Sequence, residues 1–184
     1  AIACSLMVIA GPGDEVLLPI PCWVSYTEMI RLAGAKPVFV PVRPDNYELD
    51  LEAIEKAIGP NTKAIVICTP NNPTGAVYRE KDLRRLAELA VEHDFFIVAD
   101  EIYEKLVYDG AKHFSVASIS REVRDRTITV NGFSKAYAMT GWRIGYAAAR
   151  ADVIKGIMAI QSQTTSLKRP RWLPCKAPSM NCVI

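Results

Sequence analysis

A single lysine and a single arginine stand among small and aromatic residues in the stretch NGFSKAYAMTGWRIGY, residues 131–146. A lysine in a buried or cationic environment loses proton affinity and becomes an amine nucleophile that forms a Schiff base with an aldehyde. Arg143 is a neighbour of that kind for Lys135, and an arginine also binds a phosphate through two parallel hydrogen bonds. The hydroxyl of Ser134 and backbone N–H groups of the loop would complete a phosphate site. The stretch therefore predicts a ligand that carries both an aldehyde and a phosphate.

Further polar side chains follow the ends of several apolar runs. Ligands of an open α/β sheet bind at the carboxyl ends of its strands, so side chains that follow parallel strands converge. Taken singly, each of these residues has an ordinary structural explanation such as a helix cap, a turn or packing. Their joint occurrence at strand ends favours a site. The residues are Trp23 after EVLLPI (15–20), Asn72 after AIVICT (64–69), Asp100 and Tyr103 at and after the end of FFIVAD (95–100), and Ser134 and Lys135 after TITVN (127–131).

Asp100 adds the acid that this ligand chemistry requires. Pyridoxal 5′-phosphate (PLP) carries an aldehyde, a phosphate and a ring nitrogen, and an acid beside that nitrogen keeps the ring protonated, so that it accepts electrons from a carbanion. A carboxylate at the tip of a buried strand is suited to this role. The combination of Lys135, Arg143 and Asp100 therefore indicates PLP as the cofactor.

The elements that must position these residues alternate along the chain. Apolar runs at 15–20, 36–42, 64–69, 95–100, 127–131 and 144–149 lack a polar alternation, which is typical of strands buried on both faces. Between them lie amphipathic helical patterns, at 79–94 and at 49–59, and the chain opens on an apolar helical pattern. We expect an α/β fold of three layers, with a mostly parallel, mixed sheet and flanking helices.

Composition limits the classes of partner. The 184 residues are 50% hydrophobic and carry a net charge of +2, which does not indicate a nucleic-acid or membrane surface. Five cysteines lack disulfide or metal-ligand spacing and favour a reducing compartment. No apolar run reaches the roughly 18 to 20 residues of a membrane span. Because the sequence starts inside a helical pattern, we expect it to be cut from a longer protein; residues 166–184, rich in proline and without a period, are expected to form an irregular tail of doubtful origin.

Four longer motifs resemble one family. PGDEVLLPIPCWVSY, PNNPTGAVY, DEIYEKLVYDG and NGFSKAYAMTGWRIGYAAA are similar to segments of the class I aminotransferases of fold type I, and most of all to aspartate aminotransferases of the bacterial and plastid type. The similarity runs from about residue 6 to residue 166. It implies that residues 1–165 form a partial PLP-binding large domain, that is, an incomplete PLP-dependent transferase domain.

The resemblance implies roles for the residues around the cofactor ring. Lys135 would hold the cofactor aldehyde as a Schiff base and, once released by substrate, would shuttle a proton as the catalytic base. Asp100 would pair with the pyridine nitrogen. Tyr103 and Asn72 would hydrogen-bond the ring O3′, and Asn72 would also touch the substrate carboxylate. Trp23 would stack on the ring and border the substrate pocket.

The resemblance also implies a phosphate site made by Arg143 and Ser134. Many relatives carry a phosphate-binding serine three residues before the lysine, and in this chain that position is Gly132, which makes Ser134 a less secure ligand than Arg143. The peptide bonds before Pro21 and Pro73 are expected to be cis.

Other parts of the family's site are expected to lie outside this sequence. They are a Gly-Ala-Lys turn that grips the phosphate, a small domain whose arginine binds the substrate α-carboxylate, and a tyrosine from the neighbouring subunit. Family members are homodimers with active sites at the interface. We therefore expect a homodimer for the full-length protein and no transamination by this chain alone.

The expected reaction is transfer of an amino group from aspartate to 2-oxoglutarate, which gives oxaloacetate and glutamate. Aminotransferases for prephenate, alanine or aromatic amino acids remain alternatives, as does a non-catalytic truncated product. A dinucleotide-binding dehydrogenase is disfavoured because GPGDE, the only Gly-x-Gly run, precedes a strand instead of following one. The expected compartment is the cytoplasm, with a plastid as the alternative.

Five conspicuous residues are left out of the predicted site. His93 and His113 have no partner at ligand spacing and are expected at the surface or as helix caps. Glu101 should point to the sheet face opposite Asp100 and act as a structural acid. Tyr137 and Trp142 flank the lysine loop and are expected to pack it.

Overall fold

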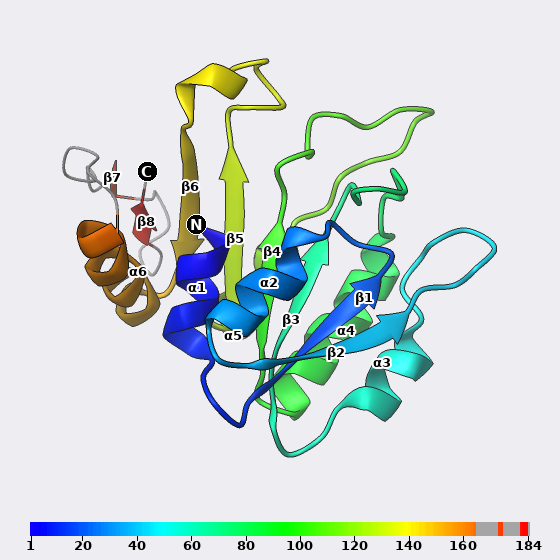
Figure 1. Ribbon diagram of the computed structural model, residues 1–184. Helices are drawn as coiled ribbons and strands as arrows, with labels where there is room; N and C mark the ends of the chain where they lie inside the picture. Colours follow the sequence, from blue (N-terminus) through cyan, green and yellow to red (C-terminus); the bar gives the residue numbers. More distant parts are fainter. Residues whose placement is uncertain (165–172, 175–180, 184) are drawn as a thin grey trace.

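An eight-stranded mixed sheet forms the middle of the molecule (Figure 1). The structure is a computed structural model that describes residues 1–164, 173–174 and 181–183. Five neighbouring strands are parallel, and the last three are antiparallel to their neighbours. In spatial order the strands are β2 (Lys36–Pro41), β1 (Glu15–Ile20), β3 (Thr62–Cys68), β4 (Phe96–Asp100), β5 (Thr127–Gly132), β6 (Gly145–Ala149), β8 (Asn181–Val183) and β7 (Leu173–Pro174).

Helices cover both faces of this sheet. On one face lie α1 (Ile2–Ile9), α2 (Ser25–Leu32) and α6 (Ala151–Thr164), and on the other lie α3 (Leu51–Ala57), α4 (Glu80–Glu92) and α5 (Arg121–Arg126). Two short 3₁₀ helices, η1 (Val116–Ser118) and η2 (Thr140–Trp142), interrupt the loops. The predicted α/β fold of three layers is confirmed.

The central strands are mostly apolar because each contributes side chains to two hydrophobic cores. In β1, Val16 and Leu18 join the core under α1, α2 and α6, whereas Leu17 joins the core under α3 and α4. In β3, Val66 and Ile67 divide in the same way. Successive side chains of a strand point to opposite faces. When helices cover both faces, most positions of the strand are buried and therefore apolar.

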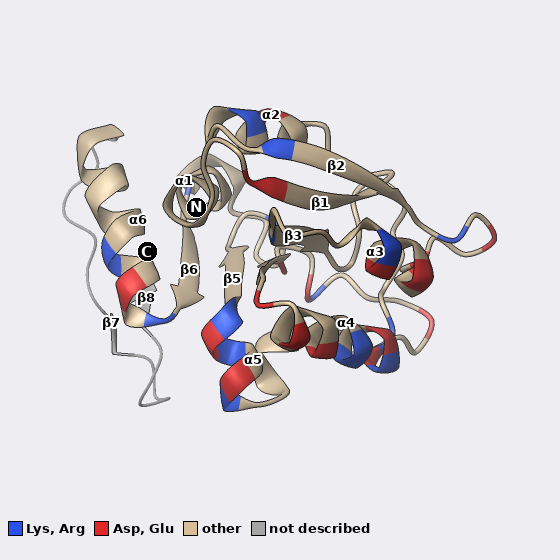
Figure 2. Ribbon diagram, turned by 90° about the horizontal axis from the view of Figure 1, so that it is seen from below, with Lys and Arg blue, Asp and Glu red and all other residues tan. Residues whose placement is uncertain are grey.

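The outer helices are amphipathic, as their sequences predict. Leu83 and Leu86 of α4 are fully buried against the sheet, while most charged residues of α4, with the exception of Asp82, are at least partly exposed; charged residues recur along α3, α4 and α5 (Figure 2). The Asp50 side chain starts α3 by accepting a hydrogen bond from the backbone N–H of Ala53 at 3.0 Å. An N-cap of this kind satisfies a donor that has no partner inside the helix.

The predicted strands agree with the observed ones to within two residues at each end. The helical patterns at 79–94 and 49–59 correspond to α4 and α3, and the apolar opening corresponds to α1. The prediction for the tail at 166–184 falls largely outside the described residues; within it, the structure gives β7 and β8, and β8 pairs with β6. Among the described helices, none has both the length and the apolar character that a membrane crossing requires.

Candidate functional site

A pocket of about 510 Å³ opens at the edge of the sheet where the parallel strands end. This edge lies uppermost in Figure 1. The pocket brings together every residue of the predicted site, from the ends of four parallel strands and from the start of β6. The predicted residues that line it are Trp23, Asn72, Asp100, Tyr103, Ser134, Lys135 and Arg143.

The antiparallel direction of β6 places Arg143 in this pocket. β6 pairs with β5 so that Gly145 lies opposite Gly132, and the loop from 133 to 144 therefore leaves and re-enters the sheet at the same edge. Within that loop the backbone N–H of Phe133 donates to the carbonyl oxygen of Ile144 at 3.2 Å. Lys135 and Arg143 thus lie on the two limbs of one short loop.

Asp100 is the buried acid of the pocket. It is 6% exposed, and each of its carboxylate oxygens accepts one hydrogen bond: Oδ2 from the hydroxyl of Tyr26 at 2.6 Å, and Oδ1 from the backbone N–H of Ile102 at 3.2 Å. Burial raises the pKa of Asp100, and the two hydrogen bonds oppose that rise. Within the described residues no lysine or arginine forms an ion pair with it. A buried carboxylate of this kind is stabilised by a cationic partner.

Lys135 lies on the exposed side of the pocket. Its Nζ is 5.7 Å from the centre of the Tyr103 ring. Burial raises the pKa of Tyr103, and a hydrogen bond from the side chain of Asn72 lowers it in part. Tyr103 therefore lies between two other predicted site residues. Its ring is near Lys135, which follows β5, and its hydroxyl meets the amide of Asn72, which follows β3.

Arg143 adopts a backbone conformation that is rare for a side chain other than glycine. Its φ is 53° and its ψ is 41°, and its Nη1 donates to the carbonyl oxygen of Thr140 at 3.2 Å. A residue keeps this strained backbone conformation only where the surrounding structure holds it. Such residues are common at ligand-binding sites. The arginine remains exposed, so its guanidinium is accessible to an anion.

A side chain at Gly132, where the sequence analysis expects a serine in many relatives, would be crowded. A Cβ at Gly132 would lie 3.0 Å from the carbonyl oxygen of Ile144 and 3.1 Å from Cδ1 of Ile102. The close approach of β5 and β6 therefore accounts for the glycine and leaves Ser134, half-buried in the pocket lining, as the hydroxyl nearest to Lys135 in sequence.

The loop that carries Asn72 is tied down by its own turn. The side-chain Oδ1 of Asn71 accepts from the hydroxyl of Thr74 at 2.9 Å, and the backbone N–H of Gly75 donates to the carbonyl oxygen of Asn71 at 2.8 Å. The predicted cis bonds, Ile20–Pro21 and Asn72–Pro73, are confirmed, and the structure adds a third, Thr69–Pro70, that was not predicted.

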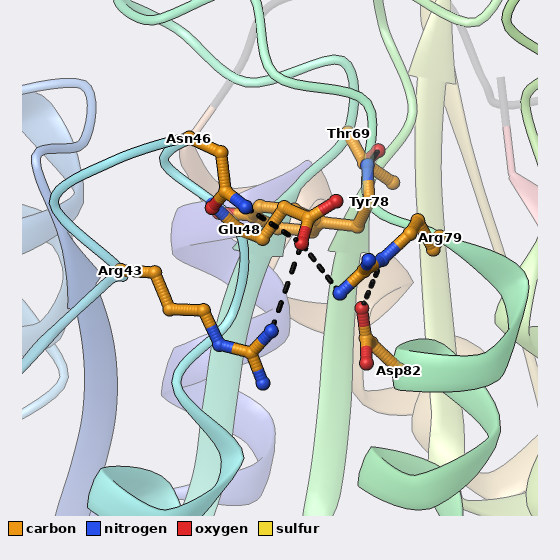
Figure 3. Close-up of polar contacts among 7 residues, drawn as sticks. All are labelled: Arg43, Asn46, Glu48, Thr69, Tyr78, Arg79 and Asp82. Carbon is orange, nitrogen blue, oxygen red and sulfur yellow. Dashed lines mark hydrogen bonds and ion pairs between the residues drawn. The ribbon is translucent and has the colours of Figure 1, made fainter.

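A charged network braces the same loop from outside (Figure 3). The carboxylate of Glu48 pairs with Arg79 at 2.5 Å and with Arg43 at 3.7 Å, and it accepts a hydrogen bond from Asn46 at 3.1 Å. Arg79 in turn donates from Nε to Asp82 at 2.8 Å. The network joins the segment after β2 to the start of α4 and so holds the α4 end of the loop around Asn72.

Sequence reasoning missed Tyr26. This tyrosine of α2 is 1% exposed and is the side chain that donates to Asp100, 74 positions away in the sequence. Its ring also meets the indole of Trp23 edge-on, with 5.4 Å between the centroids and an interplanar angle of 89°. The available signal was its spacing from Ile30, because residues four apart on a helix share a face; this spacing indicates that Tyr26 is buried and does not reveal its partner.

The prediction that His113 has no partner was wrong. Its Nε2 lies 3.3 Å from Oε2 of Glu101, and Glu101 also accepts a hydrogen bond from the Ser115 hydroxyl at 2.7 Å. A long loop returns His113 to the end of β4, which local sequence spacing does not reveal. Glu101 itself is 4% exposed and is not part of the pocket lining, as expected of a structural acid.

Comparisons with known proteins point to one family. The sequence model for "Aminotransferase class I and II" matches residues 1–174. An aspartate aminotransferase of Bacillus sp. (strain YM-2) is 51% identical over 160 residues, which are 86% of this chain and 41% of that protein. A probable aspartate/prephenate aminotransferase of Thermus aquaticus is 54% identical over 159 residues, which are 86% of this chain and 40% of that protein.

Solved structures agree with this sequence similarity. The structure of Thermus thermophilus aspartate aminotransferase with maleate superposes with a TM-score of 0.86 at 49% identity and covers 91% of this chain and 43% of the solved one. The chain thus spans about two fifths of the length of the curated relatives it matches. By sequence and by fold, the chain belongs to the class I and II aminotransferase family.

Proposed function

We propose that this chain provides the PLP-binding part of an aminotransferase. The observation that carries the proposal is Asp100, a buried carboxylate that pairs with no lysine or arginine of the described residues and lines the same pocket as the amine of Lys135. PLP is a ligand with a cationic ring nitrogen and an aldehyde on one small molecule. When bound, it supplies the electron-accepting ring that stabilises negative charge at a substrate carbon.

The residues present fit this cofactor by their chemistry. Asp100 would hold the proton on the ring nitrogen, because a buried carboxylate gains a counter-charge there. Tyr103 and Asn72 would donate hydrogen bonds to the ring hydroxyl oxygen, and Trp23 would cover the ring face. Arg143 and Ser134 would bind the phosphate. Each of these side chains lines the pocket.

Lys135 serves as both anchor and base. Its Nζ would hold the aldehyde of the cofactor, and, once free, would act as the base that takes the proton from the substrate Cα and donates it again. A primary amine on the exposed limb of the loop reaches both the aldehyde and an arriving amino acid. Asn72 and Trp23 border the space that the substrate carboxylate enters.

For the complete protein we propose transamination between aspartate and 2-oxoglutarate by a homodimer. Support comes from the relatives that are named aspartate aminotransferases and from the solved neighbour that holds maleate, a dicarboxylate. Prephenate is a second candidate amino-group acceptor, because the Thermus aquaticus relative is named for both substrates.

Reductive trapping tests the cofactor site. The complete protein is incubated with PLP, reduced with borohydride and mapped by mass spectrometry, which reports the lysine that carries the cofactor as a stable secondary amine. We expect Lys135 to carry it, Lys135→Ala to abolish that label, and Lys112→Ala, at an exposed loop lysine, to leave it unchanged. Equal labelling of Lys135 and the surface lysines would contradict the proposal.

Turnover of the complete protein tests the substrate. With 2-oxoglutarate as acceptor, we expect aspartate to react with a higher kcat/KM than alanine or an aromatic amino acid. With aspartate as donor, the rate with prephenate is compared with the rate with 2-oxoglutarate. A comparable rate would support prephenate as a second acceptor, and no reaction would exclude it. Absence of reaction with aspartate would exclude the assignment to aspartate.

A further inference from the structure

Tyr26 occupies a position from which it reaches two sides of the pocket at once. It stands in α2, is 1% exposed and lines the pocket beside the end of β4. Its hydroxyl donates to Oδ2 of Asp100 at 2.6 Å, and its ring supports the indole of Trp23. Two predicted site residues that follow different strands are therefore held by one buried side chain.

The Tyr26 hydroxyl can act only as a donor toward Asp100. Burial, followed by the negative charge of Asp100, raises the pKa of Tyr26 well above its ordinary value, so the phenol keeps its proton. Cys68, which lies beside Asp100 in the sheet, is also neutral, because burial and then the charge of Asp100 raise its pKa to about 12. The other charged groups that act on Asp100 are Glu101 and the amine of Ala1.

The second oxygen of Asp100 is held by backbone. Its Oδ1 accepts from the N–H of Ile102 at 3.2 Å, so a change at Tyr26 leaves that bond in place. A short hydrogen bond to a carboxylate is stronger than one between neutral groups. Tyr26 therefore provides the side-chain contact that both orients the carboxylate and offsets the desolvation of its charge.

We propose that Tyr26 is a positioning residue for the cofactor ring: it orients Asp100 toward the ring nitrogen, keeps that carboxylate ionised, and sets the angle of Trp23. The inference rests on the proposed PLP site. It assigns a role to a residue that does not itself touch the reacting atoms and acts through Asp100 and Trp23.

The experiment compares Tyr26→Phe with Tyr78→Phe in the complete protein. Phenylalanine keeps the ring beside Trp23 and removes only the hydroxyl. Tyr78 is an equally buried tyrosine in the opposite core, where its hydroxyl meets Asn71 at 3.4 Å and not Asp100. Titration with PLP, followed by absorbance, should show binding about tenfold weaker for Tyr26→Phe, the effect of one hydrogen bond to a charged group, and unchanged binding for Tyr78→Phe.

Two further readouts separate positioning from general stability. In the Asp100→Ala background, Tyr26→Phe should cause little further loss of PLP binding, because the Tyr26 hydroxyl then has no carboxylate to orient; an additive loss would overturn the inference. In cofactor-free protein, the carboxyl carbon of Asp100, followed by NMR, should titrate at higher pH in Tyr26→Phe than in wild type. An unchanged titration would also overturn it.

The outcomes distinguish this inference from the function on which it rests. If wild-type protein fails to bind PLP, the proposed function is wrong and the positioning role falls with it, whatever the Asp100 titration shows. If wild type binds PLP and Tyr26→Phe binds it equally well, the function stands and the role of Tyr26 is refuted.

Discussion

Asp100 shows how a site residue can work against the stability of its own fold. Its carboxylate is buried at the tip of β4, and burial raises its pKa above the ordinary value of about 4. A raised carboxyl pKa means that the folded state holds a proton which the unfolded state has already released. The ligand-free protein is therefore destabilised by ionisation of this group.

The pH dependence of stability tests this effect. The stability that neutral Asp100 contributes is fully present below its ordinary pKa and is lost as the pH rises through the raised pKa. Asp100→Asn removes the titration, so we expect the stability of the variant, relative to wild type, to increase as the pH rises from 4 to 8 in thermal melts of cofactor-free protein. A difference that is constant over this range would contradict the burial of an ionisable carboxyl.

Gly132 provides a second test at the level of a single residue. Because its Cβ position is crowded by Ile144 and Ile102, Gly132→Ala should lower the free energy of unfolding by about 1–3 kcal/mol, as overpacking does. Gly59→Ala is the matched control, since no atom lies within 4 Å of its Cβ position. Urea denaturation measures both. Equal stability of the two variants would show that β5 and β6 can separate freely.

For single residues, the sequence predicted which side chains line the pocket. It did not predict which other side chains hydrogen-bond or pair with them. Trp23, Asn72, Asp100 and Lys135 follow apolar runs, so their convergence follows from the rule that ligands lie at the ends of parallel strands. The partner of Asp100 comes from a helix 74 positions earlier, and that of His113 from across a loop. Such pairs depend on tertiary packing, which has no local sequence period.

Among the elements, the loop from β3 to α4 is held by charge. Glu48 is half-buried among Arg79, Arg43 and Asn46, and the loop's backbone is held where the N–H of Tyr78 donates to the hydroxyl of Thr69 at 3.0 Å (Figure 3). Networks of several charges hold their geometry better than single exposed ion pairs. The position of Asn72 should therefore depend on a residue that is not in the pocket.

Hydrogen exchange tests that dependence. Glu48→Gln weakens the network, and we expect the amide of Tyr78 to exchange roughly tenfold faster, because local opening of the loop becomes easier. Glu28→Gln, which disrupts only the exposed pair with Arg31, is the control and should leave this amide unchanged. Unchanged exchange in Glu48→Gln would show that the turn around Asn71 suffices by itself.

Element prediction succeeded for six strands and for α1, α3 and α4, and it missed three other helices of the described residues. The strands were recognisable because both of their faces are buried, and α4 because its charged face repeats over several turns. The helices α2, α5 and α6 were not assigned. α5 has only six residues, too few for a helical period, and α2 mixes apolar and polar residues with its buried positions limited to Tyr26 and Ile30.

For the molecule as a whole, the contact between α1 and α6 joins the beginning of the chain to the element after β6. α1 carries no charged residue, and it packs between α2 and α6 on one face of the sheet. The approach is close at Gly156 of α6, where a Cβ would lie 2.8 Å from Cγ1 of Val8. This contact holds Ala1 and Ile2 against the pocket.

Substitution at this crossing tests the packing of the two helices. In an open helix, glycine to alanine stabilises by about 1 kcal/mol, but here we expect Gly156→Ala to destabilise the protein by about 1–3 kcal/mol. Val8→Ala removes the crowding atoms, so the double variant should recover part of the loss in urea denaturation. A simple gain of stability in Gly156→Ala would mean that the helices do not pack this closely.

The central claim is that Asp100 and Lys135, which follow different strands, bind opposite ends of one cofactor. The most direct measurement is a crystal structure of the complete protein grown with PLP. We predict density continuous with Nζ of Lys135, the ring nitrogen within hydrogen-bond distance of the Asp100 carboxylate, and the hydroxyl of Tyr26 still on its other side. PLP bound to another lysine, or held with its ring nitrogen remote from Asp100, would contradict the account.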